Sequence, residues 1–493
     1  MYLGLDLGTS GVKALLMDGA QRVAGSATAP LTVQRPHPGW SEQDPDQWIT
    51  AATAALDRLA ADHGPALAAV RGIGLSGQMH GATLLDAGDR VLRPCILWND
   101  TRSHRQAAAL DADPQFRRLS GNIVFPGFTA PKLRWVEDNE PEIFAHTAKV
   151  LLSKDFLRLW LTGEHAGDPS DAAGTGWLDT GARRWSADLL AAGHMAPEQM
   201  PRLVEGTEPS GTLRPELARR WGLGGGVVVA GGGGDNAASA VGMGAVADGA
   251  AFVSLGTSGV LFAATGDYRP APASAVHTFC HALPGTWHQM GVILSASAAL
   301  DWLAGVTGTP AADLTRGLGD TLRPPGALTF LPYLSGERTP HNDAAVRGAL
   351  VGIAQDHDGA DLTRAVLQGV AFALRDNLDA LRRAGTDLNR VMAVGGGSRS
   401  RHWLRIIATA LGLPVDLPAD GDFGAAFGAA RLGLIAATGA DPAAVCTPPA
   451  IAETLAPDPT LRHAYEEAHG RFRALYPLLS GIATPAEKRE DGP

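Results

Sequence analysis

The residue with the clearest chemical potential is Asp235, whose carboxylate directly follows four glycines in the stretch VVVAGGGGDNAASAVG, residues 227–242. Valines before the glycines predict a buried strand, and the small residues after Asp235 predict a helix. A carboxylate at a helix start with little bulk around it suits a general base that takes a proton from a closely approaching hydroxyl. The alternative interpretation is that Asp235 only caps the helix.

The same stretch also fits a dinucleotide-binding pattern. Gly232, Gly234 and Ala237 have the spacing G-x-G-x-x-G/A, which makes a dinucleotide-dependent dehydrogenase a second hypothesis. Asp235 weakens that hypothesis, because an anion would occupy the turn in which a pyrophosphate needs bare N–H groups.

A repeated hexapeptide marks two further candidate sites. LGTSGV occurs at residues 7–12 and again at 255–260, each time between two apolar runs. This context predicts two β-hairpins whose turns bind phosphate oxygens, and it favours duplication of a whole domain over a repeated turn. Asp6 precedes the first copy at the position where Ser254 precedes the second. Because a carboxylate repels phosphates unless a cation lies between them, Asp6 indicates a Mg²⁺ site that acts through water, the alternative being an ordinary polar strand end.

A third glycine-rich turn follows an apolar run at residues 391–394. Gly395, Gly396 and Gly397 precede an amphipathic segment, and Ser398 is the expected N-cap of that helix. A nucleotide could lie against such a backbone, and the alternative is close packing of the helix on the strand.

Two other turns carry candidate ligands for a small molecule. SGQMHG contains Met79 and His80, and ILWND places Trp98 at a strand end. Trp98 could form a platform for the C–H face of a sugar. The alternatives are an ordinary loop position for His80 and a core position for Trp98.

Apolar strands alternating with amphipathic helices predict two α/β halves that position these residues. In the first half we expect strands at 2–7, 12–18, 71–76 and 93–98, and helices near 45–61 and 100–112. In the second half we expect strands at 251–255, 259–264 and 390–394, and helices near 295–305, 361–385 and 400–411. We place two domains at 1–245 and 246–481, followed by a polar tail at 482–493.

Composition excludes several classes of function. The 493 residues are 45% hydrophobic and carry 41 Lys and Arg against 51 Asp and Glu, a net charge of −10. This acidic balance argues against nucleic acid as a partner. Cys95, Cys280 and Cys446 lack metal-binding spacing and fit a reducing compartment. We expect no signal peptide, no membrane span and a cytoplasmic location.

Taken together, the motifs resemble those of the FGGY carbohydrate kinase family. The segments that carry the resemblance are GLDLGTSGVK, SGQMHGATLLD, RPCILWNDTR, GFTAPKLRWVEDN, SDAAGT, GGGDNAA, SLGTSGV, LPYLSGERTPH and AVGGGSRS. The resemblance implies an α/β fold of two duplicated actin-like ATPase (ribonuclease H-like) domains with a cleft between them. It also implies that ATP and Mg²⁺ bind in the cleft and that the 5-hydroxyl of D-xylulose is phosphorylated, the alternative being a related ketose or polyol.

The resemblance also implies roles for individual residues. Asp235 would be the catalytic base, and Asp6 would be a second catalytic residue near Mg²⁺ and the phosphates. The implied sugar-binding residues are Met79, His80, Trp98 and Asn236. The implied cofactor-binding residues are Gly8, Thr9, Ser10 and Lys13 in the first hairpin, Gly256 and Thr257 in the second, and Gly396 and Gly397 beside the adenosine.

Two physical expectations follow from this assignment. The glycines before Asp235 should leave room for the sugar and the γ-phosphate. The Asp235 carboxylate should be ionised at neutral pH, because its unperturbed pKa is about 4. The expected partners are small molecules, D-xylulose and ATP, and a homodimer is a hypothesis.

Overall fold

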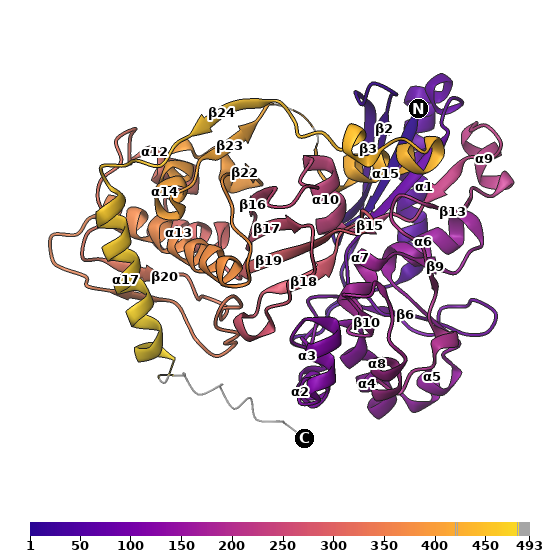
Figure 1. Ribbon diagram of the computed structural model, residues 1–493, viewed down its shortest axis with the longest axis horizontal. Coiled ribbons are helices and arrows are strands. Elements are labelled where there is room, and N and C mark those ends of the chain that lie inside the picture. The colour runs from indigo at the N-terminus through magenta and orange to yellow at the C-terminus, as the bar shows by residue number, and fades with distance from the viewer. Residues whose placement is uncertain (420, 422, 481, 483–493) are drawn as a thin grey trace.

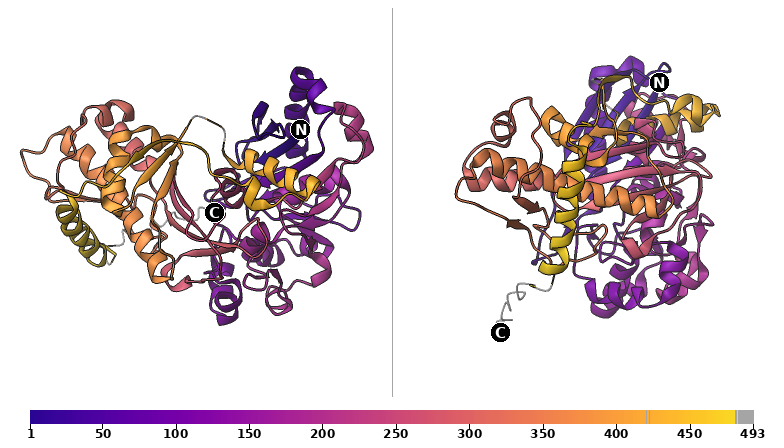
Figure 2. Two further views of the ribbon diagram at one scale, coloured as in Figure 1. Left: turned by 45° about the horizontal axis from the view of Figure 1, so that its top comes forward. Right: turned by 60° about the vertical axis from the view of Figure 1, so that its left-hand side comes forward.

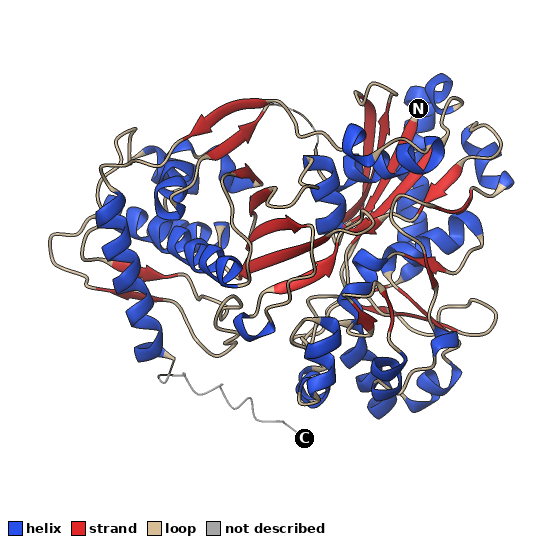
Figure 3. Ribbon diagram, viewed as in Figure 1, coloured by secondary structure: helices blue, strands red, loops and turns tan. Residues whose placement is uncertain are grey.

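The computed structural model describes residues 1–419, 421, 423–480 and 482, and it forms two α/β lobes (Figure 1). Each lobe contains a mixed β-sheet with helices packed beside it (Figure 3). The first lobe holds the N-terminal strands, and most of the second half of the chain forms the other lobe (Figure 2). Apart from Ile482, the tail predicted at 482–493 lies outside the described residues.

The first sheet has the strand order β13-β14-β5-β1-β2-β3, with β15 paired to β5. Its strands are β1 (Tyr2–Leu7), β2 (Gly11–Met17), β3 (Val23–Pro30), β5 (Gly72–Gly77), β13 (Pro209–Thr212), β14 (Val228–Ala230) and β15 (Gly233–Gly234). β1 and β2 form the predicted antiparallel hairpin, and β5 runs parallel to β1. Leu3, Leu5 and Leu7 on one face of β1 are fully buried, and Tyr2 and Gly4 on the other face are buried as well, as expected of a strand covered on both faces.

The second sheet has the order β18-β19-β17-β16-β22-β23-β24. Its strands are β16 (Ala251–Leu255), β17 (Gly259–Thr265), β18 (His277–Cys280), β19 (Trp287–Ile293), β22 (Val391–Val394), β23 (Val415–Pro418) and β24 (Ile451–Leu455). β16 pairs antiparallel with β17 and parallel with β22, which repeats the arrangement of β1, β2 and β5. The LGTSGV repeat therefore marks the same hairpin in two related sheets.

The long predicted helices are present with small differences in their ends. They are α1 (Pro45–Leu67), α11 (Ser297–Thr307), α13 (Gly359–Arg383) and α14 (Arg401–Leu411). The Asp44 side chain accepts a hydrogen bond from Asp46 N and fixes the start of α1. Among the described helices, none has both the length and the apolar character that a membrane span needs.

Two elements differ from the expectations for residues 93–112. The predicted strand at 93–98 is reduced to β7 (Cys95–Ile96), which pairs with β4 (Glu42–Gln43) outside the main sheet. Pro94 has no N–H to donate to a ladder, so pairing cannot extend through it. The expected helix at 100–112 is α2 (His104–Asp111), because residues 100–103 form a tight turn around the Asp100 carboxylate.

One helix from late in the sequence packs on the first sheet. α15 (Ala425–Thr438) lies beside the N-terminal strands (Figure 1). A β-carbon at Gly74 of β5 would lie 1.8 Å from Ala429 O, and one at Gly428 would lie 1.8 Å from Ala238 O in α10 (Asp235–Met243). Glycines thus allow α15 to touch both the sheet and the helix that begins at Asp235. The domain boundary at 245 stays a prediction.

Candidate active site

Asp6 and Asp235 lie at the same edge of the first sheet. Asp6 is next to last in β1, Asp235 directly follows β15, and β5 runs parallel between these two strands. Ser76 of β5 is in register with Asp6 on one side and with Gly233 on the other. The Ser76 hydroxyl donates a hydrogen bond to Asp6 Oδ1 at 2.9 Å. The two carboxylates therefore meet at the carboxyl ends of parallel strands, where α/β sheets bind their ligands.

Asp235 is the first residue of α10 and does not occupy the N-cap position. Gly234 holds that position, and no side chain accepts a capping hydrogen bond there. Asp235 Oδ1 instead accepts hydrogen bonds from the backbone N and the side-chain Nδ2 of Asn236, at 2.7 and 2.9 Å. The interpretation of Asp235 as a helix cap is therefore wrong.

The environment of Asp235 changes its protonation. Burial, followed by the negative charge of Asp6, raises the pKa of the Asp235 carboxyl to about 7. The sequence-based expectation of an ionised carboxylate rested on the unperturbed value, and in the folded protein without ligands the Asp235 carboxyl holds its proton to much higher pH. A pKa near the working pH is what makes a carboxylate an efficient general base.

We expect this pKa to appear in the stability of the protein without nucleotide or Mg²⁺. The folded pKa of Asp235 lies above the value of about 4 of an unfolded Asp, so the folded state holds the extra proton between about pH 4 and about pH 7. The free energy of unfolding of the wild type therefore falls relative to that of Asp235→Asn as pH rises through this window, and the difference levels off above it. Thermal unfolding of both proteins from pH 5 to 9 measures the effect. A difference that does not vary with pH would contradict the raised pKa.

Protein atoms, not open space, surround the glycines before Asp235. A β-carbon at Gly231 would lie 2.1 Å from Glu205 O, and one at Gly234 would lie 2.9 Å from Met79 Cγ. Gly232 has a φ of +77°, and a β-carbon there would lie 2.4 Å from Leu75 O. The expectation that these glycines leave room for ligands is therefore wrong. They are required because neighbouring chain segments and the Met79 side chain approach the turn closely.

Met79 packs against the turn that carries Asp235, and His80 follows Met79 in the chain. Met79 is buried against Gly234, and the His80 ring stacks on Phe128 with centroids 4.8 Å apart. His80 Nδ1 lies 2.7 Å from Gly174 O, and because a carbonyl only accepts, Nδ1 carries the hydrogen. Burial lowers the pKa of His80 to about 3, so the ring is neutral and Nε2 is a hydrogen-bond acceptor. A neutral acceptor of this kind suits a hydroxyl group of a sugar.

Trp98 is joined to the turn of the first hairpin. Its side chain is exposed, and its Nε1 donates to Thr9 Oγ1 at 3.0 Å. The Thr9 hydroxyl donates in turn to Gln78 Oε1 at 3.0 Å. Trp98 is therefore a surface residue and not a core residue. Gln43, which the sequence analysis missed, donates from Nε2 to Thr9 O at 2.8 Å, and no local sequence signal points to it.

The remaining predicted residues of the first hairpin lie around this turn. Gly8 and Ser10 are turn residues between β1 and β2, with Ser10 exposed, and Lys13 of β2 is directly opposite Asp6. In the second hairpin, Gly256 and Thr257 form the turn between β16 and β17, and the Thr257 side chain is exposed. Their carbonyl oxygens accept hydrogen bonds from Ser297 N and Ala296 N, which attaches this turn to the start of α11.

A cavity of about 560 Å³ lies where α10 faces the strands β16, β22 and β23. Asn236 of α10, Ser254 of β16, Gly395 and Phe423 are among the residues that line it. Its size and mixed polar and apolar walls suit a nucleotide. Asn236, predicted at the sugar, lines this cavity and also hydrogen-bonds Asp235.

The third glycine turn borders this cavity through Gly395 and Ser398. A β-carbon at Gly397 would lie 2.9 Å from Trp403 Cζ3, so Gly397 permits close packing, while Gly396 faces open space. The predicted N-cap is wrong: Ser400 caps α14 by accepting from Trp403 N, and the Ser398 hydroxyl donates to Gly395 O within a 3₁₀ turn. That extra turn separates strand and helix by two residues more than the pattern suggested.

The residues around Asp6 fit Mg²⁺ bound through water. Asp6 and Ser76 offer hard oxygen atoms at one edge of the sheet, as Mg²⁺ prefers. A group of three side chains able to hold a metal directly occurs elsewhere in the described part of the chain, at Asp376, Asp379 and His469. Those acids already pair with Arg473 and Arg375. An ion at Asp6 would therefore complete its shell with waters and phosphate oxygens.

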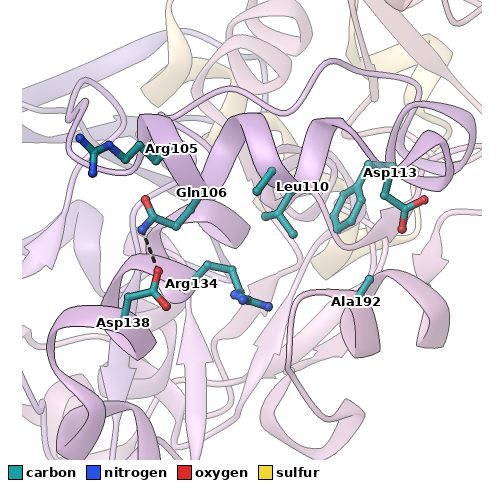
Figure 4. Close-up of a pocket in the computed structure, with 9 residues that line it drawn as sticks. Arg105, Gln106, Leu110, Asp113, Arg134, Asp138 and Ala192 are labelled. Atoms are coloured by element: carbon teal, nitrogen blue, oxygen red, sulfur yellow. Dashed lines mark hydrogen bonds between the residues drawn. The ribbon is translucent and has the colours of Figure 1, made fainter.

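A second large cavity, of about 630 Å³, lies away from this site in the first lobe (Figure 4). α2, α4 (Thr129–Asn139) and neighbouring elements line it, and Gln106 Nε2 donates to Asp138 Oδ2 across its wall at 2.8 Å. None of the predicted site residues is among those that line it.

Comparisons with known proteins show the family to which this chain belongs. Residues 1–242 match the N-terminal domain and residues 251–437 the C-terminal domain of the FGGY family of carbohydrate kinases. The chain is 49% identical to a xylulose kinase of Escherichia coli K12, over 97% of this chain and 99% of that protein.

Two solved structures extend the comparison. A xyloylose kinase from Brucella ovis is 66% identical, with a TM-score of 0.97, and covers 98% of this chain and 99% of its own. A xylulose kinase from Rhodospirillum rubrum is 32% identical, with a TM-score of 0.91 and the same coverage. The predicted pair of actin-like ATPase domains is confirmed, and the dehydrogenase hypothesis is wrong. The chain is a phosphotransferase that belongs to the FGGY family of carbohydrate kinases.

Proposed function

We propose that the protein transfers the γ-phosphoryl group of ATP to the 5-hydroxyl of D-xylulose, with Asp235 as general base. The observation that carries the proposal is the position of Asp235. Its neighbours in the chain are Gly234, against which Met79 packs, and Asn236, which lines the cavity of about 560 Å³ and hydrogen-bonds the Asp235 carboxylate, so one carboxylate stands beside both candidate substrate sites. The kinases of E. coli and B. ovis named above support xylulose as the sugar.

Each group has one role in this mechanism. The neutral His80 ring accepts a hydrogen bond from a sugar hydroxyl, and Trp98 offers its exposed ring to the C–H face of the sugar. Asp235 orients the 5-hydroxyl and takes its proton as oxygen bonds to phosphorus. The hairpin turns at Gly8–Ser10 and Gly256–Thr257 hold the phosphates through backbone N–H groups and hydroxyls. Phosphoryl transfer depends mostly on such alignment and charge stabilisation.

Mg²⁺ bound near Asp6 would neutralise the charge of the phosphates. Asp6 and Ser76 would hold its water shell, and Lys13, opposite Asp6 on β2, adds positive charge beside the same turn. Gly396 and Gly397 beside the adenosine, a homodimer and a cytoplasmic location stay hypotheses.

The identity of the sugar is tested by coupled ADP release over pentuloses, hexuloses and polyols. We expect D-xylulose to give a kcat/KM at least about tenfold above every other sugar, because the site's hydrogen-bonding groups discriminate against missing or misplaced hydroxyls. As a matched control, 5-deoxy-D-xylulose should compete with D-xylulose without being phosphorylated. If another ketose or a polyol is turned over faster, that compound and not xylulose is the substrate, and the assignment as a sugar kinase still holds.

A further inference from the structure

The four-glycine turn before Asp235 must be held in place by contacts from other segments of the chain. Close approaches of Glu205, Leu75 and Met79 leave room only for glycine at residues 231, 232 and 234. Glycine has more backbone freedom than any other residue, so a run of four glycines does not fix the residue after it. A carboxylate that must meet a hydroxyl within a few tenths of an ångström therefore needs a second means of support.

Two buried side chains hold this turn at its two ends. Arg158 of α6 (Ser153–Thr162) donates from Nη1 to Ala230 O at 2.5 Å and from Nη2 to Gly231 O. At the other end, Ser170 Oγ accepts a hydrogen bond from Gly234 N at 3.1 Å. The residue after Gly234 is Asp235, so the Ser170 contact is the last one before the proposed base.

Ser170 is itself fixed by a network of buried charges. Its hydroxyl donates to Asp168 Oδ2, and its backbone N donates to the same oxygen at 2.8 Å. Lys154 Nζ lies 2.7 Å from Asp168 Oδ1, 2.6 Å from Asp155 Oδ1 and 3.1 Å from Asp171 Oδ2. Because the Ser170 hydrogen is committed to Asp168, a lone pair of Oγ remains directed at Gly234 N–H.

Stability alone does not account for this network. The side chains of Lys154, Asp168 and Asp171 are fully buried, and burying charges costs about as much free energy as their pairing returns. What such a network adds is a single geometry, since each partner is held by several others.

We propose that Ser170, held by Asp168 and Lys154, is a positioning residue for Asp235. This inference rests on the proposed role of Asp235 as general base. In this assignment Ser170 contacts neither substrate. It fixes the position of Gly234 N–H and thereby the direction in which the Asp235 carboxylate points.

The test is Ser170→Ala, which removes the hydroxyl and leaves every buried charge in place. We expect kcat to fall about 10-fold to 100-fold, because a small misplacement of a reacting group has effects of this size. The KM values for D-xylulose and ATP should stay within about threefold, because the predicted contacts to both substrates are retained. The matched control is Ser186→Ala, another buried serine whose Oγ accepts from a backbone N–H, that of Leu189 at 3.3 Å. That variant should keep full kcat.

A double variant separates this inference from the proposed function. If Ser170 acts through the base, adding Ser170→Ala to Asp235→Asn should cause no further loss of kcat. The same loss in both backgrounds, or an unchanged kcat in Ser170→Ala alone, would overturn the positioning role. An active Asp235→Asn protein would instead refute the proposed base, and that result is read from the single variant.

Discussion

Asp235→Asn is expected to lower kcat for D-xylulose by about 10²-fold to 10⁴-fold, the usual contribution of a general base. Asn keeps the size of the side chain and can still accept the hydrogen bonds from Asn236 N and Nδ2. It cannot take the proton of the sugar hydroxyl. The KM for xylulose should therefore change little, and steady-state ADP release measures both constants.

Unfolding cannot explain the expected loss. The raised pKa shows that an ionised Asp235 is unfavourable in the folded protein, so Asn should increase the melting temperature at pH 8. Loss of activity together with a higher melting temperature would show that the variant is folded and that the chemical step is impaired. Full activity in a folded Asp235→Asn protein would remove Asp235 from the mechanism.

Asp6→Asn is expected to lower kcat about 10-fold to 100-fold at ordinary Mg²⁺ concentrations, the size of effect seen when a group that holds a metal through its water shell is changed. The defect should shrink as Mg²⁺ is raised, because a weakened ion site fills at higher concentration. Mg²⁺ titration of ADP release in the wild type, Asp6→Asn and Asp235→Asn measures this. Asp235→Asn is the matched control, since it lies at the same sheet edge and should show no such rescue.

A second consequence of Asp6→Asn concerns the neighbouring acid. The charge of Asp6 helps to raise the pKa of Asp235, so its removal should lower that pKa. The pH window of the stability difference described above should then move to lower pH. An Asp6→Asn defect that Mg²⁺ does not relieve would argue that Asp6 supports the hairpin through Ser76 and does not bind the ion.

Local patterns in the sequence were enough to predict much of the fold and the leading candidate base. The apolar runs around the two LGTSGV copies predicted both hairpins, because alternating burial is a property of a few neighbouring residues. The isolation of Asp235 among glycines made it the leading candidate base, and the family motifs fixed the fold and the class of reaction. The strand predicted at 93–98 was too long, because Pro94 has no N–H to donate to a ladder and pairing begins only at Cys95.

Only the tertiary structure explains the packing around these residues and the pKa of Asp235. The glycines before Asp235 appeared to make room for a substrate, but Met79, Glu205 and Leu75 fill that space from distant parts of the chain. The pKa of Asp235 is set by burial and by Asp6, and neither is visible in the stretch that contains it. Ser170 begins the motif SDAAGT, but neither Ser170 nor Lys154 gave a local signal of its role, since each acts through a contact across the fold. Periodicity reports which way a side chain faces, whereas close approach and charge coupling depend on pairs of residues that only folding brings together.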